Sequence, residues 1–200
     1  MNPPANLKTV NDIIRHRRSI KPALVDPDAP IPDPLLKDIL ENANWAPTHG
    51  MTEPWRFHLF TGDARQRLAH TLQAIYKETT PAENIRSDKL EKLGTNPLLA
   101  PLVIAIVMHR QDIEKIAELD EIAAVACAVQ NMHLTASTAG LAAFWSSPPL
   151  LSSPQMNAFL KIGPKDKVLG LFYLGWPLDK DAWPQSTRHP IEEKLTWHKD

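Results

Sequence analysis

The sequence predicts a single α+β domain. Its 200 residues are 43% hydrophobic and 22% charged, which is enough apolar material for one buried core without cross-links. Short apolar runs that suit strands alternate with longer segments whose apolar residues recur at helical spacing, and no repeat or low-complexity tract interrupts them. We therefore expect one domain over residues 1–200, with a mobile excursion at 78–97 and a C-terminal arm at 176–200.

Two helices are expected before the first strand. Thr9 and the residues after it look like a capped helix start, and this helix should run into Arg17. Asp33 and Pro34 form an N-cap and N1 pair for a second helix, which Pro47 stops. The apolar stripe of the second helix is Leu35, Leu36, Ile39, Leu40 and Ala43.

The middle of the chain predicts two strands and a helix. A strand is expected around Phe57 and Leu59, and a turn at residues 61–63 closes it. Residues 78–97 contain a proline, a glycine and several charges, which favours the mobile excursion. Residues 102–108 are rich in Val and Ile and predict a buried strand. The helix between the two strands has the apolar residues Leu68, Leu72, Ile75 and Tyr76.

An apolar, alanine-rich helix is expected from Asp120 to Ala139, about 30 Å long at the usual rise per residue. Its small residues would let another backbone approach closely, so it is either the spine of the domain or half of a subunit interface. Cys127 is assigned to the core. Strands at 141–145 and 168–174 and a helix that begins at Ser153 complete the domain.

Composition removes several classes of function. The seven glycines form no phosphate-binding motif, and the eight histidines include no pair at metal-ligand spacing, so no metal site is expected. A net charge of −1 gives no basic surface for nucleic acid. One cysteine suits a reducing compartment, and neither a signal-like N-terminus nor a membrane span is visible. We therefore expect a cytoplasmic protein without nucleic-acid or membrane partners.

Two segments carry most of the functional signal. The first, Arg17-Arg18-Ser19-Ile20-Lys21, supplies the cationic forks and the hydroxyl that bind a phosphate and a polyol. The second is the loop at residues 46–57, which lies between a helix and a strand and contains His49 and Glu53. Together they suggest an anionic cofactor. Taken alone, each of these residues is more commonly a surface charge or a loop-packing side chain.

The order of these segments resembles the FMN-dependent nitroreductase family, in particular its compact branch of small NAD(P)H nitroreductases. The likeness spans nearly the whole chain. It includes the segments Arg17-Arg18-Ser19, 39–47, 54–57, 62–65, the alanine-rich helix, 141–145 and 170–175. The resemblance implies helices around a small, mostly antiparallel sheet, in an intertwined homodimer with FMN at the subunit interface.

The resemblance also implies residue roles. Arg17 would contact the FMN phosphate and Arg188 would complete the phosphate clamp. Arg18 and Ser19 would contact the phosphate, the ribityl chain or the ring edge, and Lys21 is expected near the ring. The residues that would line the ring from the same subunit are Phe144, Trp145 and Ser146, and those from the other subunit are His49 and Glu53.

The sequence departs from the family at three places, one of which is that the Pro-x-Glu-Gly flavin loop of the better-known branch is not found. Glu53 stands where the family usually has a neutral Gln or Asn, and Ala142-Ala143 replaces a common glycine pair. Glu53 either faces away from the flavin or lowers its potential. The function implied is ping-pong transfer of reducing equivalents from NAD(P)H to nitroaromatics, quinones or similar acceptors. The alternatives are a flavin enzyme for enones or halogenated aromatics, and a non-enzymatic flavin-binding protein.

Overall fold

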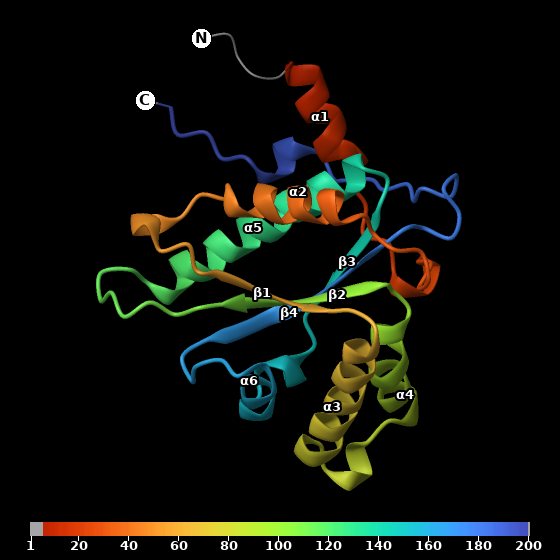
Figure 1. Ribbon diagram of the computed structural model, residues 1–200. Coiled ribbons are helices and arrows are strands. Elements are labelled where there is room, and N and C mark those ends of the chain that lie inside the picture. Colours follow the sequence, from red (N-terminus) through yellow and green to blue (C-terminus); the bar gives the residue numbers. More distant parts are fainter. Residues whose placement is uncertain (1–5, 200) are drawn as a thin grey trace.

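The computed structural model describes residues 6–199, which form a four-stranded sheet between layers of helices (Figure 1). The strand order is β1 (Trp55–Phe60), β2 (Leu102–Met108), β4 (Lys167–Gly175) and β3 (Ala142–Ser146), and every neighbouring pair is antiparallel. All residues of β2 are buried, as expected for a Val- and Ile-rich strand with a partner on each side. The predicted α+β class with an antiparallel sheet is confirmed.

Each face of the sheet has its own hydrophobic core. Helices α2 (Asp33–Asn44) and α5 (Glu118–Thr138) cover one face, where Ile104 and Ile106 pack. Helices α3 (Asp63–Thr79) and α6 (Pro154–Leu160) cover the other face (Figure 1). The side chains of β2 point alternately to the two cores, which is the period of two that a strand imposes.

The expected helices form, with shifted starts at the first two and at α5, which begins at Glu118 instead of Asp120. Helix α1 (Leu7–His16) begins two residues before Thr9, because the side chain of Asn6 caps it by accepting from the backbone N–H of Lys8 at 2.8 Å. Asp33 is the first residue of α2 rather than its cap, which is Pro32. These differences are small because caps are local signals that neighbouring residues can also supply.

Residues 78–97 contain helix α4 (Ser87–Thr95), which packs against α3. The hydroxyl of Tyr76 on α3 accepts from the backbone N–H of Arg86 at 3.1 Å, and the amide of Gln73 donates to the carbonyl of Leu90 at 3.0 Å. The segment is therefore more structured than its composition suggests. Its mobility stays a prediction.

Helix α5 is buried on one side only. Cys127, which we assigned to the core, is exposed, so that assignment is wrong. It lies on an exposed stripe with Ala123 and Leu119, which are one and two turns before it. The sequence did not predict this exposed stripe, because alanine and cysteine occur in a buried core and at an interface alike.

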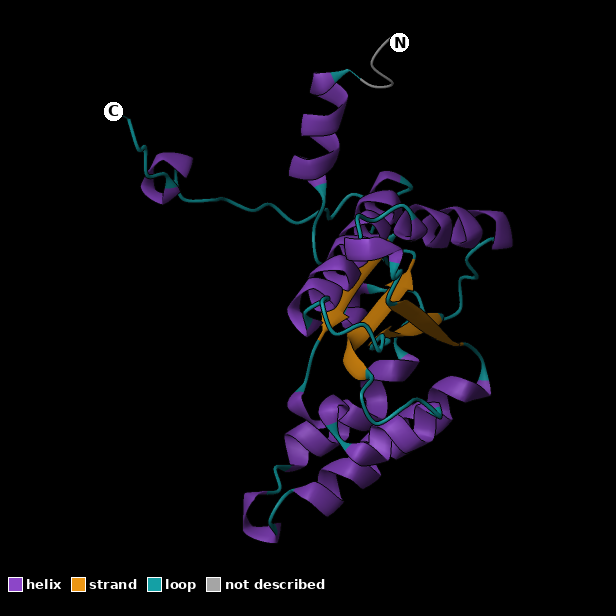
Figure 2. Ribbon diagram, turned by 90° about the vertical axis from the view of Figure 1, so that its left-hand side faces the viewer, coloured by secondary structure: helices purple, strands orange, loops and turns teal. Residues whose placement is uncertain are grey.

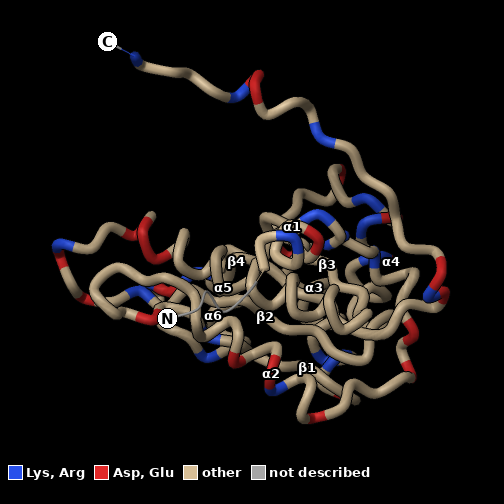
Figure 3. The backbone as a smooth tube through the Cα atoms, turned by 90° about the horizontal axis from the view of Figure 1, so that it is seen from above, with Lys and Arg blue, Asp and Glu red and all other residues tan. Residues whose placement is uncertain are grey.

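The first and last segments of the described residues project away from the sheet. Helix α1 has no buried residue, and Figure 2 shows it standing away from the rest of the protein beside the C-terminal segment. Residues 176–199 contain an isolated bridge from Pro177 to Val25 and a short 3₁₀ turn, Ile191–Lys194, and their last part leaves the body of the protein (Figure 3). Within residues 6–199, no helix is both long and apolar enough to span a bilayer.

Candidate functional site

The basic segment 17–21 leaves the end of α1 and runs beside strand β3. The backbone N–H of Ile20 donates to the carbonyl of Ala143 at 2.9 Å, and the Ile20 side chain is buried. Arg17 is the C-cap residue of α1, as the sequence predicts. The sheet edge therefore fixes the backbone that presents the two arginines.

Arg17, Arg18 and Arg188 line one pocket of 580 Å³. The lining residues are Ile14, Arg15, Arg17, Arg18, Gln130, Ser186 and Arg188. Burial lowers the pKa of Arg17, and the nearby charges of Arg188 and then Arg18 lower it further. Four arginines and no carboxylate line this pocket, so the arrangement favours an anionic ligand that would relieve the repulsion.

The other members of the basic segment have different contacts. The Arg18 guanidinium donates to backbone carbonyls, among them that of Pro184 on the C-terminal arm at 2.8 Å. The Ser19 hydroxyl accepts a long hydrogen bond of 3.5 Å from Arg17. Lys21 is exposed, and within residues 6–199 its ammonium makes no hydrogen bond or ion pair. Arg17 is thus the member of the segment best placed to receive an anion.

Strand β3 directs its side chains to opposite faces of the sheet. Trp145 packs at the edge of the α2–α5 core, whereas Phe144 packs at the edge of the α3–α6 core. The contact of each of these residues with a flavin ring stays a prediction. The indole N–H of Trp145 is buried without a partner among the described residues, directly against Gly170, where an added Cβ would lie 2.2 Å from the nitrogen. Ser146, the last residue of β3, is half-buried.

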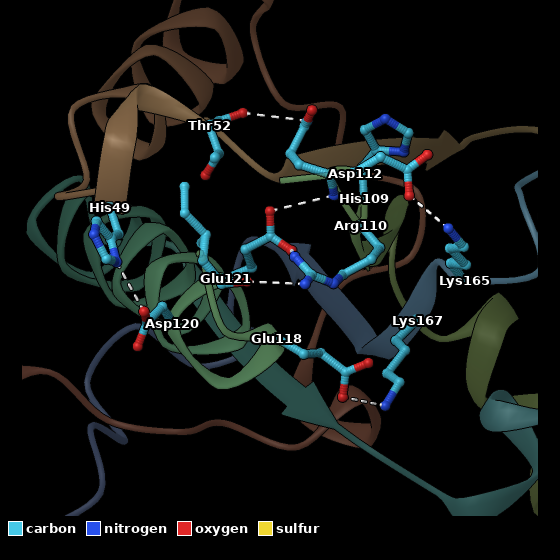
Figure 4. Close-up of polar contacts among 12 residues, drawn as sticks. His49, Thr52, His109, Arg110, Asp112, Glu118, Asp120, Glu121, Lys165 and Lys167 are labelled. Atoms are coloured by element: carbon cyan, nitrogen blue, oxygen red, sulfur yellow. Dashed lines mark hydrogen bonds and ion pairs between the residues drawn. The ribbon is translucent and has the colours of Figure 1, made fainter. Parts of the chain in front are cut away.

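His49 and Glu53 lie on the loop before β1. His49 Nδ1 contacts a carboxylate oxygen of Asp120 at 2.8 Å, at the start of α5 (Figure 4). Three residues of this loop have positive φ, namely Gly50, Met51 and Glu53, and the last is held by a hydrogen bond from its backbone N–H to the Thr48 hydroxyl. Such strain occurs at functional loops more often than elsewhere.

A single chain does not bring this loop to the arginine pocket. His49 contacts Asp120 at the start of α5, while the carbonyl of Arg18 contacts His133 near the end of the same helix. These two α5 positions are separated by thirteen helical steps, which correspond to about 20 Å. His49 and Glu53 could join Arg17 only if a second chain supplied them, as the family resemblance implies.

Two buried polar residues on α5 were missed at the sequence level. His133 donates through Nε2 to the carbonyl of Arg18 at 2.9 Å, and burial lowers its pKa to about 4. Glu121 is 1% exposed and pairs with Arg110 at 2.6 Å (Figure 4). The signal was available, because a charged or imidazole side chain inside an apolar helix requires a partner.

The Arg110–Glu121 pair also supports the loop that carries His49. Glu121 accepts from the backbone N–H of Gln111 at 3.3 Å, and the amide of Gln111 donates to the carbonyl of Thr52 at 3.4 Å. Figure 4 shows these contacts between the start of α5 and the loop. The buried Arg110–Glu121 pair therefore helps to hold Thr52, and with it the strained loop, in place.

The chain belongs to the Nitroreductase family, whose profile matches residues 14–176. It is 28% identical over 189 residues, 94% of this chain and 93% of the relative, to a Bacillus subtilis protein named "Putative NAD(P)H nitroreductase YfhC". A nitroreductase-like family protein from Bacillus cereus superposes with a TM-score of 0.82 at 25% identity, with complete coverage of both chains. The FMN-dependent nitroreductase NfnB from Mycobacterium smegmatis, solved with NADPH, has a TM-score of 0.73 at 18% identity over 96% of this chain and 99% of its own.

Proposed function

We propose that this protein is an FMN-dependent oxidoreductase that carries reducing equivalents from NAD(P)H to nitroaromatics, quinones or similar electron-poor acceptors. The observation that carries the proposal is the pocket in which Arg17, Arg18 and Arg188 converge without a counter-carboxylate. Family membership and the NAD(P)H nitroreductase name of the Bacillus subtilis relative support it.

The donor set suits FMN better than a flavin with two phosphates. Arg17 and Arg188 offer charged forks for one terminal phosphate, and no glycine-rich loop supplies backbone N–H groups for a second. The hydroxyl of Ser186 lies in the same pocket and could bond a further phosphate oxygen. Riboflavin, which lacks the phosphate, should gain nothing from these residues.

When bound, FMN would supply the redox chemistry, accepting a hydride from the nicotinamide and then reducing the acceptor in a ping-pong sequence. The protein needs no nucleophile or acid–base pair of its own for this. Arg17 and Arg188 would bind and orient the phosphate, and segment 18–21 would run along the ribityl chain beside β3. His49 and Glu53 would approach from the second subunit of a homodimer.

Replacement of Arg17 by Ala tests the phosphate role. A hydrogen bond to a charged group contributes about 1.5 to 3 kcal/mol, so Arg17→Ala should weaken FMN binding roughly 10- to 100-fold and leave riboflavin binding unchanged. Both dissociation constants can be measured by flavin fluorescence quenching. Arg67→Ala, at an exposed position on α3, is the matched control and should change neither. Equal losses of FMN and riboflavin would contradict the proposal.

Anaerobic absorption spectroscopy tests whether the protein transfers electrons from NAD(P)H to an acceptor. NADH or NADPH should bleach the visible absorption of the flavin-loaded protein, and a nitroaromatic or a quinone should restore it. Bleaching by dithionite but by neither nucleotide would instead indicate a flavin-binding protein without a donor site. Faster re-oxidation by enones or halogenated aromatics than by nitroaromatics would assign the acceptor class differently.

A further inference from the structure

Two contacts fasten the C-terminal arm to the end of α1. The indole N–H of Trp183 donates to the carbonyl of His16 at 2.8 Å, and the two rings stack with centroids 5.5 Å apart and 5° between their planes. His16 is the last residue of α1, so its carbonyl has no partner within the helix. Trp183 therefore satisfies an open helix end while it holds the arm.

Arg18 makes the second contact. Its Nε donates to the carbonyl of Pro184 at 2.8 Å, and its Nη1 donates to the carbonyls of Arg15 at 2.6 Å and Arg17 at 2.8 Å. The rigid fork of a guanidinium can join three carbonyls in this way, whereas a lysine ammonium holds no such fixed geometry. The carbonyl of Arg18 is itself held by His133. Arg18 thus links α5, α1 and the arm.

Beyond Pro184 the arm has little else to hold it. Residues 185–199 are exposed, and the guanidinium of Arg188 donates only to the Ser186 hydroxyl and the Thr187 carbonyl within the described chain. Arg188 nevertheless lies close enough to Arg17 to lower its pKa. Because two like charges repel, other contacts must hold Arg188 near Arg17. The contacts nearest to Arg188 along the chain that join the arm to the rest of the protein are those of residues 183 and 184.

We infer that Arg18 and Trp183 are positioning residues that fasten the arm so that Arg188 stands opposite Arg17 across the pocket. This inference rests on the proposed phosphate role of Arg17. It assigns Arg18 to the scaffold of the anion site, because the carbonyls of residues 15, 17 and 184 already occupy most of its donors. Trp183 then affects the bound phosphate without touching it.

The substitution Trp183→Phe tests the inference, because it removes the indole N–H and keeps an aromatic ring against His16. We expect FMN to bind roughly 3- to 10-fold more weakly, as for the loss of one neutral hydrogen bond, and riboflavin to bind as before. Trp45→Phe, the same change at an exposed position at the end of α2, should alter neither affinity. Equal losses of FMN and riboflavin in Trp183→Phe would overturn the inference.

A double-mutant cycle separates positioning from general weakening. If Trp183 acts through Arg188, Trp183→Phe should have no further effect on FMN affinity once Arg188 is replaced by Ala. Fully additive losses would overturn the inference. If instead Arg17→Ala fails to distinguish FMN from riboflavin, the phosphate role itself fails, and the two failures are therefore distinguishable.

The flavin-free protein provides a readout that does not depend on the cofactor. Trypsin should cleave after Lys180 and Arg188 faster in Trp183→Phe and in Arg18→Lys than in the parent protein or in Trp45→Phe, because the arm detaches more often. Thermal unfolding followed by circular dichroism would show that both variants are folded. Unchanged cleavage rates in both would contradict the fastening role.

Discussion

His133 is a neutral histidine held inside the protein by a backbone carbonyl. Its Nε2 must carry the proton, because the carbonyl of Arg18 can only accept, and the ring lies edge-on to Phe172 at 5.5 Å. Burial lowers its pKa from 6.5 to about 4, and the charge of Arg17 acts in the same direction. The carbonyl of Arg18, beside the arginine pocket, is therefore held by a histidine that stays neutral down to low pH.

This burial predicts a pH-dependent stability. Between pH 6.5 and about 4 the unfolded chain binds a proton at His133 and the native state does not. The free energy of unfolding should therefore fall as the pH drops through this window, by about 3 kcal/mol in total, and no contribution should arise above it. Urea unfolding at several pH values measures the slope.

His133→Gln is the informative variant, because glutamine can donate to the Arg18 carbonyl and does not titrate. Its stability should depend less on pH between 6.5 and 4 than that of the parent. His70→Gln, at an exposed position on α3, should retain the parental slope. Identical slopes in the parent and His133→Gln would show that His133 does not control this window.

The loop at 48–53, which only a second chain could bring to the proposed site, is shaped by its neighbours. Gly50 has φ of +61°, and a Cβ at this position would lie 2.8 Å from the buried Ile116 side chain. Gly140, which follows the C-cap of α5, has φ of +80° and no atom within 4 Å of an added Cβ. Both glycines have a positive φ, but only Gly50 has another side chain close to where a Cβ would lie.

Gly50→Ala should therefore destabilise the protein more than Gly140→Ala. Both variants place an L-residue in a left-handed conformation, which costs about 1–2 kcal/mol, and Gly50→Ala adds a contact with Ile116 that requires repacking. Chemical denaturation of the two variants beside the parent measures the difference. Equal destabilisation would mean that Ile116 yields freely and that the loop is less constrained than the structure indicates.

For the whole molecule, the exposed apolar surface favours a homodimer. Helix α1 buries none of its residues, and Leu7, Leu119 and Trp197 are each more than 70% exposed in the single chain. Trp176 and Trp183 contribute less free aromatic surface than the sequence suggests, because their indole N–H groups bond to carbonyls of Pro30 and His16. The homodimer stays a proposal.

Removal of residues 180–200 should cost both dimerisation and flavin binding, because it deletes Trp197 together with Arg188. Removal of residues 190–200 alone keeps Arg188, and the preference for FMN over riboflavin should then persist even where the dimer is weaker. Light scattering and flavin titration measure the two properties separately. A folded, flavin-loaded monomer of the full chain would contradict the proposal, since the loop with His49 would then lie far from the pocket.

The sequence by itself determined the segments that became helices and strands, because their apolar residues recur with periods that report local geometry. Its resemblance to a family also singled out Arg17 and Arg188 for a phosphate, whereas either arginine taken alone reads as a surface charge. Only the tertiary structure decided that Arg18 bonds to backbone carbonyls, that Cys127 is exposed, and that His133 and Trp183 support the pocket. Each of these outcomes depends on which distant backbone lies next to a side chain, and periodicity along the chain carries no information about that.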